Sequence, residues 1–366
     1  MIKKRQTTQG ARYDVRLRSP DGRVYNRTFR TKREAERYEA TERADRARGA
    51  WLDPRHAETT FADAAKTWLD SNPAKRDGAW ARDESVIRLH LDPALEGRSV
   101  GSITPADVQG LVNGWMAAGR APRTVRRQYG TLRAILNHAV ASDMIARTPC
   151  RSIKLPGLEP LARPSVTADD LVRLVEALPA ECRPMVHLGA VLGLRWGECA
   201  GLRVGRLDFF GRTLTVAEQR TRGKAGAMVD GPPKSAAGHR TLSVPGPLMD
   251  LLAEHLAARE LTGADGEAHV LVTPEGHPLE YSGWRQRAWL PACRAAGLEG
   301  LGFHDLRRAN ATALVAAGVD LKTAQTRMGH SDVRLTLAVY AQATDAADRS
   351  AADALGAQFM GNSESA

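Results

Sequence analysis

The stretch that decides the fold begins at Phe303-His304-Asp305-Leu306-Arg307 and runs to Tyr340. Apolar spacing predicts a helix over 305–317, with His304 and Arg307 three residues apart and therefore on one face. A second helix is expected over 321–328, ending in Met328-Gly329-His330, where the glycine closes the helix and turns the histidine outward. Tyr340 follows ten residues after His330. This stretch therefore brings a phenol, two imidazoles and a guanidinium together, groups suited to nucleophilic and acid–base chemistry.

Two further candidates lie earlier in the chain. Arg195 follows an apolar run predicted to be helical to about residue 194, so it emerges at the end of a buried element, and Glu198 comes three residues later. Lys234 lies in Pro232-Pro233-Lys234-Ser235, in a predicted β-hairpin ahead of His239-Arg240. Lys224 falls in the same hairpin region, so the choice of lysine stays open, although the Pro-Lys-Ser context favours Lys234.

Several chemistries have no sequence support. The residue five before Gly223-Lys224 is Glu218 rather than glycine, so no phosphate-binding loop is formed, and neither His-Glu-x-x-His nor Gly-x-Gly-x-x-Gly occurs. The four cysteines have spacings that suit neither a zinc site nor a small disulfide framework. No apolar run approaches the ~20 residues of a membrane span, and no signal peptide is recognised. We therefore expect no cofactor and no metal, and a location in the cytoplasm.

The charge of the chain points to a polyanionic partner. Lys and Arg number 52 against 42 Asp and Glu, giving a formal net charge of +10. Residues 1–57 hold 16 basic and 8 acidic residues, so most of the excess lies in the first sixth of the chain. A local excess of this kind is typical of nucleic-acid binders, but a solubilising surface would look the same.

The order Arg…Lys…His-x-x-Arg…Gly-His…Tyr resembles the tyrosine recombinases, specifically the phage-type integrases. The resemblance covers about residues 58–345, and residues 1–57 resemble the small arm-binding domain of many integrases. Each short motif is weak alone; the complete set in order, with ten residues from His330 to Tyr340, carries the resemblance. Family members often have His-Thr after the second arginine, whereas this chain has Arg308-Ala309-Asn310. That departure leaves the six matched positions intact.

The resemblance implies six catalytic residues and one supporting carboxylate: Arg195, Lys234, His304, Arg307, His330, Tyr340 and Glu198. Tyr340 would attack a DNA phosphodiester and form a 3′-phosphotyrosine intermediate. Arg195 and Arg307 would hold the non-bridging oxygens, and His330 would hydrogen-bond the phosphate. His304 would take the tyrosine proton, while Lys234 would protonate the leaving 5′ oxygen. The protein–DNA bond conserves the phosphodiester energy, which agrees with the missing nucleotide and metal motifs.

The implied fold is multidomain and mainly α with small β elements. We expect an arm-type DNA-binding module over 1–57 (two or three strands, then one helix), a helical core-binding domain over 58–152, a Pro-rich linker over 153–164, a mixed α+β catalytic domain over 165–345, and an Ala-rich C-terminal helix or tail over 346–366. Six arginines are candidate phosphate contacts. They lie on a predicted strand and on a predicted helix over 123–142: Arg12, Arg16, Arg18, Arg123, Arg126 and Arg127.

Local signals predict individual elements. A strand is expected over 23–30 and a helix over 32–48; Thr104-Pro105 and Pro122 each mark a helix start. Thr167 and Asp170 form a predicted capping box. Beyond it we expect strands over 207–210, 213–217 and 240–244, and helices over 247–259, 282–296, 305–317 and 321–328.

The resemblance implies site-specific recombination that integrates a mobile element, with excision as a second expected reaction. Expected partners are double-stranded DNA at attachment sites and three further copies of the chain in a tetramer, with an excision factor or a DNA-bending host protein as accessory factors and no membrane. We expect the protein to associate with the nucleoid. Two alternatives use the same fold: a type IB topoisomerase-like relaxing enzyme, and a DNA-binding regulator that does not cleave.

Overall fold

The computed structural model describes residues 2–8, 10–18, 22, 24–47, 53, 55–159, 166–224, 226–334 and 337, and three pairs at 352–353, 355–356 and 358–359. By contacts, the chain divides into two compact units, Met1–Glu159 and Pro160–Ala366. Most of the predicted C-terminal helix or tail over 346–366 lies outside the described residues.

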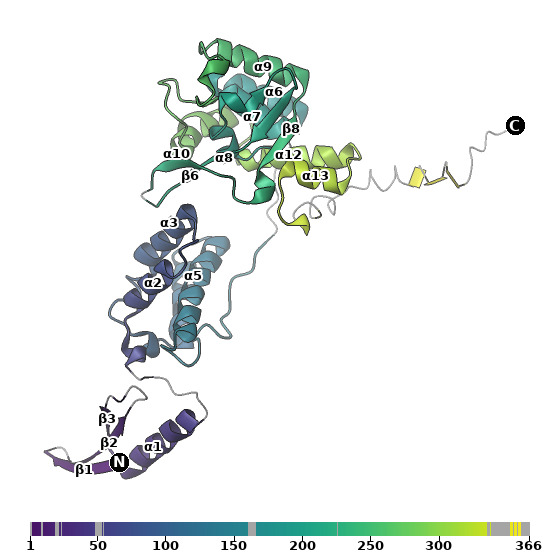
Figure 1. Cartoon of the computed structure of the whole chain (residues 1–366). Helices are drawn as coiled ribbons and strands as arrows, with labels where there is room; N and C mark the ends of the chain where they lie inside the picture. Colours follow the sequence, from purple (N-terminus) through teal and green to yellow (C-terminus); the bar gives the residue numbers. More distant parts are fainter. Residues whose placement is uncertain are drawn as a thin grey trace. The chain divides into compact units, whose positions relative to one another are not determined.

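The chain starts with a three-stranded antiparallel sheet and one helix (Figure 1). The sheet is formed by β1 (Ile2–Thr7), β2 (Gly10–Arg18) and β3 (Val24–Phe29), followed by α1 (Lys32–Ala47). Val15 and Leu17 of β2 are buried together with Ala35 of α1. The expected sheet of two or three strands followed by a helix is confirmed, with three strands. The position of β1 was not predicted, since its sequence Ile-Lys-Lys-Arg-Gln-Thr is mostly exposed and lacks apolar alternation.

Residues 55–150 form a helical bundle. Its main helices are α2 (Phe61–Asp70), α3 (Asp77–Val86), α4 (Pro105–Ala117) and α5 (Pro122–Ala141). A π-helical turn, Ile87–Leu91, extends α3. Helix α4 begins where the Thr104-Pro105 signal predicted, and Thr104 caps it in a capping box with Asp107 that was not predicted. Helix α5 begins at the predicted Pro122 and buries an apolar stripe of Val125, Tyr129, Leu132 and Leu136.

The first part of the predicted linker is fastened to this bundle. The Gln109 side chain of α4 accepts a hydrogen bond from the Lys154 backbone N–H at 2.8 Å and donates one to the Lys154 carbonyl at 3.2 Å. Arg126 of α5 donates from Nε to the Pro156 carbonyl at 2.8 Å. Because three bonds hold residues 154–156, this part of the chain forms a strap on the bundle rather than a loose connection.

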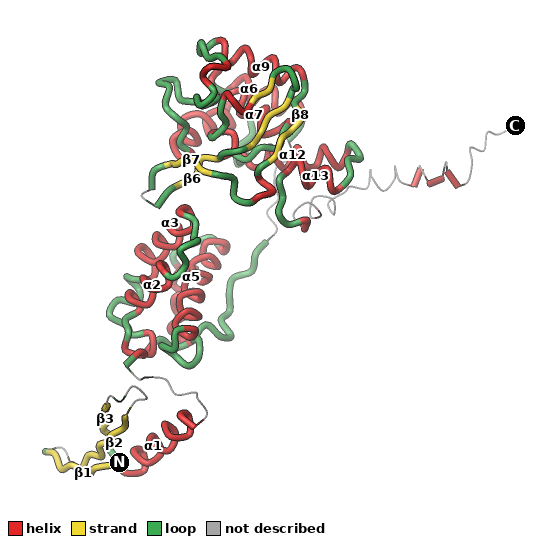
Figure 2. Tube along the Cα trace, viewed as in Figure 1, coloured by secondary structure: helices red, strands yellow, loops and turns green. Residues whose placement is uncertain are grey.

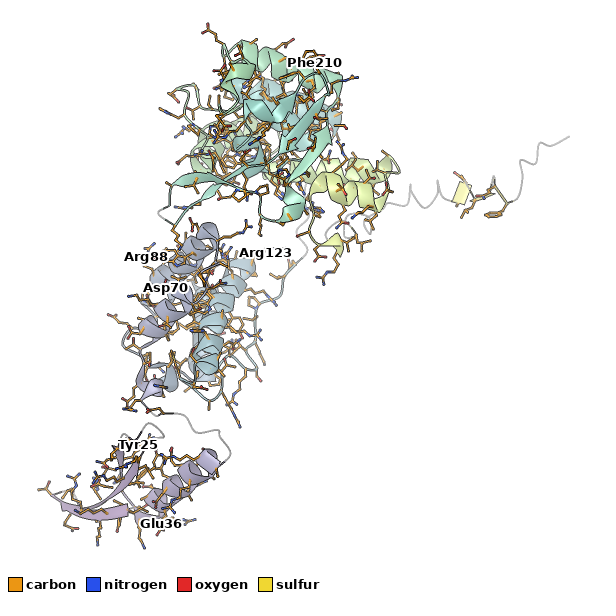
Figure 3. The ribbon with its side chains drawn as sticks, in the orientation of Figure 1. Tyr25, Glu36, Asp70, Arg88, Arg123 and Phe210 are labelled. Atoms are coloured by element: carbon orange, nitrogen blue, oxygen red, sulfur yellow. The ribbon has the colours of Figure 1, made fainter. Side chains whose placement is uncertain are left out.

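The second unit packs helices around a small sheet (Figure 2). The sheet has the order β4-β5-β8, with β4 (Leu207–Asp208), β5 (Thr213–Val216) and β8 (Arg240–Ser243) antiparallel. A separate hairpin pairs β6 (Gln219–Arg222) with β7 (Met228–Gly231). Phe210, in the turn between β4 and β5, is fully exposed (Figure 3).

The helices of this unit supply most of its core. They are α6 (Ala168–Ala177), α7 (Arg183–Val191), α8 (Trp196–Ala200), α9 (Gly246–Ala257), α10 (Tyr281–Trp284), α11 (Leu290–Ala295), α12 (Phe303–Ala316) and α13 (Leu321–Met328). Single 3₁₀ turns occur in both units at His56–Glu58, Val100–Ser102, Ala180–Cys182, Val204–Arg206, Ala236–Gly238 and Gly263–Asp265. The predicted capping box of Thr167 with Asp170 opens α6.

Three local predictions need correction. The helix expected over 282–296 contains a π-helical turn, Arg285–Trp289, just before Pro291, whose ring removes a backbone donor. The apolar helix expected to reach residue 194 ends at Val191, because Gly193 adopts φ +66°. The hairpin strands β6 and β7 were not predicted individually, since they are rich in Arg, Gln and Gly.

Candidate active site

The turn between α7 and α8 presents the first predicted arginine. Arg195 is the residue before α8, and its backbone N–H donates to Glu198 Oε2 at 3.0 Å. Its Nη1 donates to Glu198 Oε1 at 2.6 Å. The Glu198 side chain is only 2% exposed, whereas that of Arg195 is 36% exposed. The buried carboxylate therefore holds the guanidinium on its inner side and leaves its outer side accessible to solvent.

Helix α12 carries the second arginine inward. Arg307 is buried, and its two terminal nitrogens donate to the carbonyls of Gly193 and Met328. Burial, followed by the positive charge of Arg195, lowers the pKa of Arg307 to about 9. His304, one turn earlier on the same helix, is exposed. The predicted His-x-x-Arg spacing therefore places an exposed imidazole one helical turn from a buried guanidinium.

Asn310 lies just after Arg307, in the segment where this sequence departs from the family pattern. Its side-chain amide donates to the carbonyls of Ala190 and Val191, each at 2.9 Å. These carbonyls belong to the last turn of α7, where no further helical N–H is available to them. Asn310 therefore holds α12 against α7 and supports the turn that leads to Arg195.

The C-terminal end of α13 receives three guanidinium groups on three successive carbonyls. Arg240 Nε donates to Arg327 O at 2.8 Å, Arg307 Nη2 donates to Met328 O, and Arg195 Nη2 donates to Gly329 O at 3.2 Å. The negative end of a helix dipole favours cations at this position. Gly329 ends the helix in the left-handed conformation, φ +58°, as the sequence predicted.

His330 follows directly and is partly buried. Its backbone N–H donates to Gln325 O at 3.2 Å. Burial, and then the charges of Arg307 and Arg195, lower the pKa of His330 to about 4. The imidazole is therefore neutral at physiological pH, and one of its ring nitrogens carries a proton that it can donate.

Arg240 was not among the predicted site residues. It donates to Glu198 Oε2 at 3.0 Å, to Glu198 Oε1 at 3.3 Å and to Gly238 O at 3.0 Å. Burial by itself raises the pKa of Glu198, but the hydrogen bonds and charge of Arg240, with the charge of Arg195, outweigh it and lower that pKa. The sequence held a signal, since Arg240 shares the inward face of a strand with Leu242.

Sequence comparison agrees with this geometry. Residues 164–347 match the phage integrase family, and residues 60–116 match the N-terminal SAM-like domain of phage integrases. The prophage phiRv2 integrase of Mycobacterium tuberculosis is 30% identical over 357 residues, covering 94% of this chain and 92% of that protein. The chain belongs to the phage integrase family. It is a tyrosine-type site-specific recombinase.

Other relatives agree with this assignment. The integrase of Mycobacterium phage D29 is 28% identical, with 91% of this chain and 90% of that one covered. Among solved structures, the Tn1549 transposon integrase has a TM-score of 0.68 at 19% identity, over 81% of this chain and 100% of that chain. A lambda integrase dimer bound to a core site has a TM-score of 0.58 at 18% identity, over 93% and 96%. The expected mainly helical, multidomain recombinase fold is thereby confirmed.

The remaining predicted catalytic residues are Lys234 and Tyr340. In the integrase, Lys234 is exposed and lies after β7, between the β6–β7 hairpin and β8, rather than in the hairpin itself. The turn of the hairpin carries Lys224, also exposed. Tyr340 lies outside the described residues.

The candidate phosphate contacts are on the surface of the first unit. Arg16 and Arg18 are exposed on β2, and Arg12 is partly buried there. Arg123 and Arg127 are exposed near the start of α5, where Figure 3 labels Arg123. Arg126 is exposed as well but uses its Nε to hold the strap. Within the residues that the structure describes, no helix of the integrase is long and apolar enough to cross a membrane.

Proposed function

We propose that Tyr340 is the nucleophile and that Arg195, Arg307 and His330 surround the phosphate it attacks. The observation that carries this proposal is the convergence of the two arginines on the carbonyls of Met328 and Gly329, immediately before His330. Arg195 is partly exposed, and its two terminal nitrogens each donate one hydrogen bond within the protein, so further N–H groups can face a phosphate. Tyr340 lies ten positions after His330 in the chain.

In the proposed reaction the phenol oxygen of Tyr340 bonds to phosphorus while the bond to the 5′ oxygen breaks. His304 accepts the phenol proton, which is needed because a phenol has a pKa of ~10. Lys234 donates a proton to the leaving 5′ oxygen, and its exposed loop suits a group that must reach DNA. Arg195 and Arg307 offset the charge that develops on the non-bridging oxygens. Glu198 positions Arg195.

We assign the other parts of the chain by the same logic. Residues 1–57 form an arm-type DNA-binding module with Arg12, Arg16 and Arg18 as phosphate contacts, and 58–152 form a core-binding domain with Arg123, Arg126 and Arg127 in that role. Residues 153–164 link it to a catalytic domain over 165–345, and 346–366 form a C-terminal element. The active assembly is a homotetramer on two attachment sites in the nucleoid, assisted by an excision factor or a DNA-bending host protein. A lambda integrase tetramer has been solved on a Holliday junction.

The test is recombination between attachment-site plasmids. Wild-type protein is expected to yield recombinant product, while Y340F, R195Q and R307Q yield none although they still bind the sites. K234A and K224A decide between the two lysines, since loss of strand cleavage is expected for K234A alone. Recombination by Y340F at the wild-type rate would overturn the assignment of the nucleophile.

A further inference from the structure

Arg240 is a buried cation within the active-site cluster whose hydrogen bonds all go to the protein. Its side chain is 4% exposed. Four N–H···O bonds reach the two oxygens of Glu198, the carbonyl of Gly238 and the carbonyl of Arg327. A guanidinium has five N–H groups, so these bonds account for all but one. Arg240 is therefore committed to holding the site and does not reach DNA.

The charge balance around Glu198 shows what Arg240 can do. The buried carboxylate accepts from Arg195 on one side and from Arg240 on the other. With Arg240 present, three arginines lie around one carboxylate, which leaves two net positive charges at the site. Without Arg240, only Arg195 would be bonded to Glu198, and Arg195, Arg307 and Glu198 together would carry one net positive charge. The positive potential above Arg195, the arginine that faces the phosphate, would then be weaker.

Arg240 also contacts the end of α13, the helix that precedes His330. Its Nε holds the carbonyl of Arg327, the first of the three clamped carbonyls at the end of α13. A side chain at Gly329 would place its Cβ 2.9 Å from Arg240 Nη1, so the helix end and this guanidinium are in close contact. Strand β8, helix α8 and helix α13 therefore meet at one side chain.

We propose that Arg240 is a positioning residue for strand cleavage: it neutralises Glu198 from the buried side, so that Arg195 keeps its positive charge for the scissile phosphate, and it anchors the end of α13. This inference rests on the proposed function, in which Arg195 holds that phosphate. A charge that is fixed before the substrate arrives costs no reorganisation during the reaction.

The experiment measures single-turnover cleavage by the full-length protein on a nicked suicide substrate. Two versions of the DNA are compared: the ordinary phosphodiester, and a methylphosphonate in which a neutral methyl replaces one non-bridging oxygen at the scissile position. Removing one preorganised donor from such a site costs ~10²–10³-fold in rate, so removing a group that acts through Arg195 should cost about 100-fold. We expect this loss for R240M on the phosphodiester, and less than about tenfold on the neutral substrate, which needs less positive charge.

Two further variants make the result specific. R240K keeps a positive charge beside Glu198 and should retain most of the cleavage rate. E198Q/R240M restores the net charge and should cleave at least about tenfold faster than R240M. It also removes the uncompensated buried charge, so it should fold even if R240M does not. DNA binding should change less than about threefold, since Arg240 faces the interior.

The outcomes distinguish the role of Arg240 from that of the proposed active site as a whole. An R240M protein that cleaves the phosphodiester within threefold of wild type overturns the inference. So does an equal loss on both substrates, or a double variant no faster than R240M, because either result indicates a merely structural role. Y340F and R195Q are measured in parallel: if these cleave normally, the proposed active site itself is wrong, whereas their failure beside a normal R240M rejects the role of Arg240 alone.

Discussion

Gly329 offers a direct test of how tightly the end of α13 is held. The residue adopts φ +58° and ψ +44°, and a Cβ built there would lie 2.9 Å from the carbonyl oxygen of Ala237 and 2.9 Å from Arg240 Nη1. Two costs therefore add in G329A. A left-handed conformation costs an alanine about 1–2 kcal/mol. Overpacking against a backbone carbonyl and a buried guanidinium adds about 1–3 kcal/mol.

Gly318 provides a matched control. It also has a positive φ, +69°, just after a helix, but a Cβ there would have nothing within 4 Å. G318A should lose only the conformational part, about 1–2 kcal/mol of the free energy of unfolding. The difference between the two variants, about 1–3 kcal/mol, then measures the close approach alone.

The assay is urea unfolding of the full-length protein followed by pulse proteolysis, which reports the catalytic unit separately from the helical bundle by fragment size. Strand cleavage is measured on the same samples under conditions in which both variants are folded. G329A should also lose about 100-fold in cleavage rate, because displacing a positioned group by about 1 Å has that effect, whereas G318A should not. Equal destabilisation of the two variants, or normal cleavage by G329A, would refute this reasoning.

Three further predictions use other parts of the chain. His330 has a pKa lowered from 6.5 to about 4, so it contributes stability that is complete above about pH 6.5 and is lost as the pH falls towards 4; the difference in unfolding free energy between wild type and H330Q should shrink by up to about 3 kcal/mol over that range, and parallel pH profiles would count against it. Q109A removes both side-chain bonds to Lys154, so limited proteolysis should cut the strap faster than in wild type, with A106S at an exposed position of the same helix as the comparison; equal cutting rates for Q109A and wild type would show that these bonds do not hold the strap. R127Q should reduce the slope of log K against log salt for DNA binding by about 0.9, the value for one phosphate, and an unchanged slope would remove this arginine from the interface.

The features that could be predicted from the sequence are those encoded locally. The capping box of Thr167 with Asp170, the start of α5 at Pro122 and the glycine that ends α13 each involve residues within a few turns of one another, and each was confirmed. The family could be recognised for a related reason, since its motif is an ordered set of residue types at limited spacing.

Other features depend on contacts between distant parts of the chain. Arg240 meets Glu198 from 42 residues away and Arg327 from 87 residues away, so neither contact is visible as spacing. The fastening of Lys154 by Gln109 spans 45 residues. The hairpin strands β6 and β7 were missed because cross-strand pairing, and not apolar alternation, defines them. Predicting these features requires the fold first.

The central claim is that the phenol of Tyr340 becomes covalently bonded to DNA. A suicide substrate nicked beside the cleavage point should trap this bond, and protease digestion followed by mass spectrometry identifies the residue that carries the nucleotide. We expect a 3′-phosphotyrosine on the peptide that contains Tyr340 and no adduct with Y340F. An adduct on another residue, or one that still forms with Y340F, would contradict it.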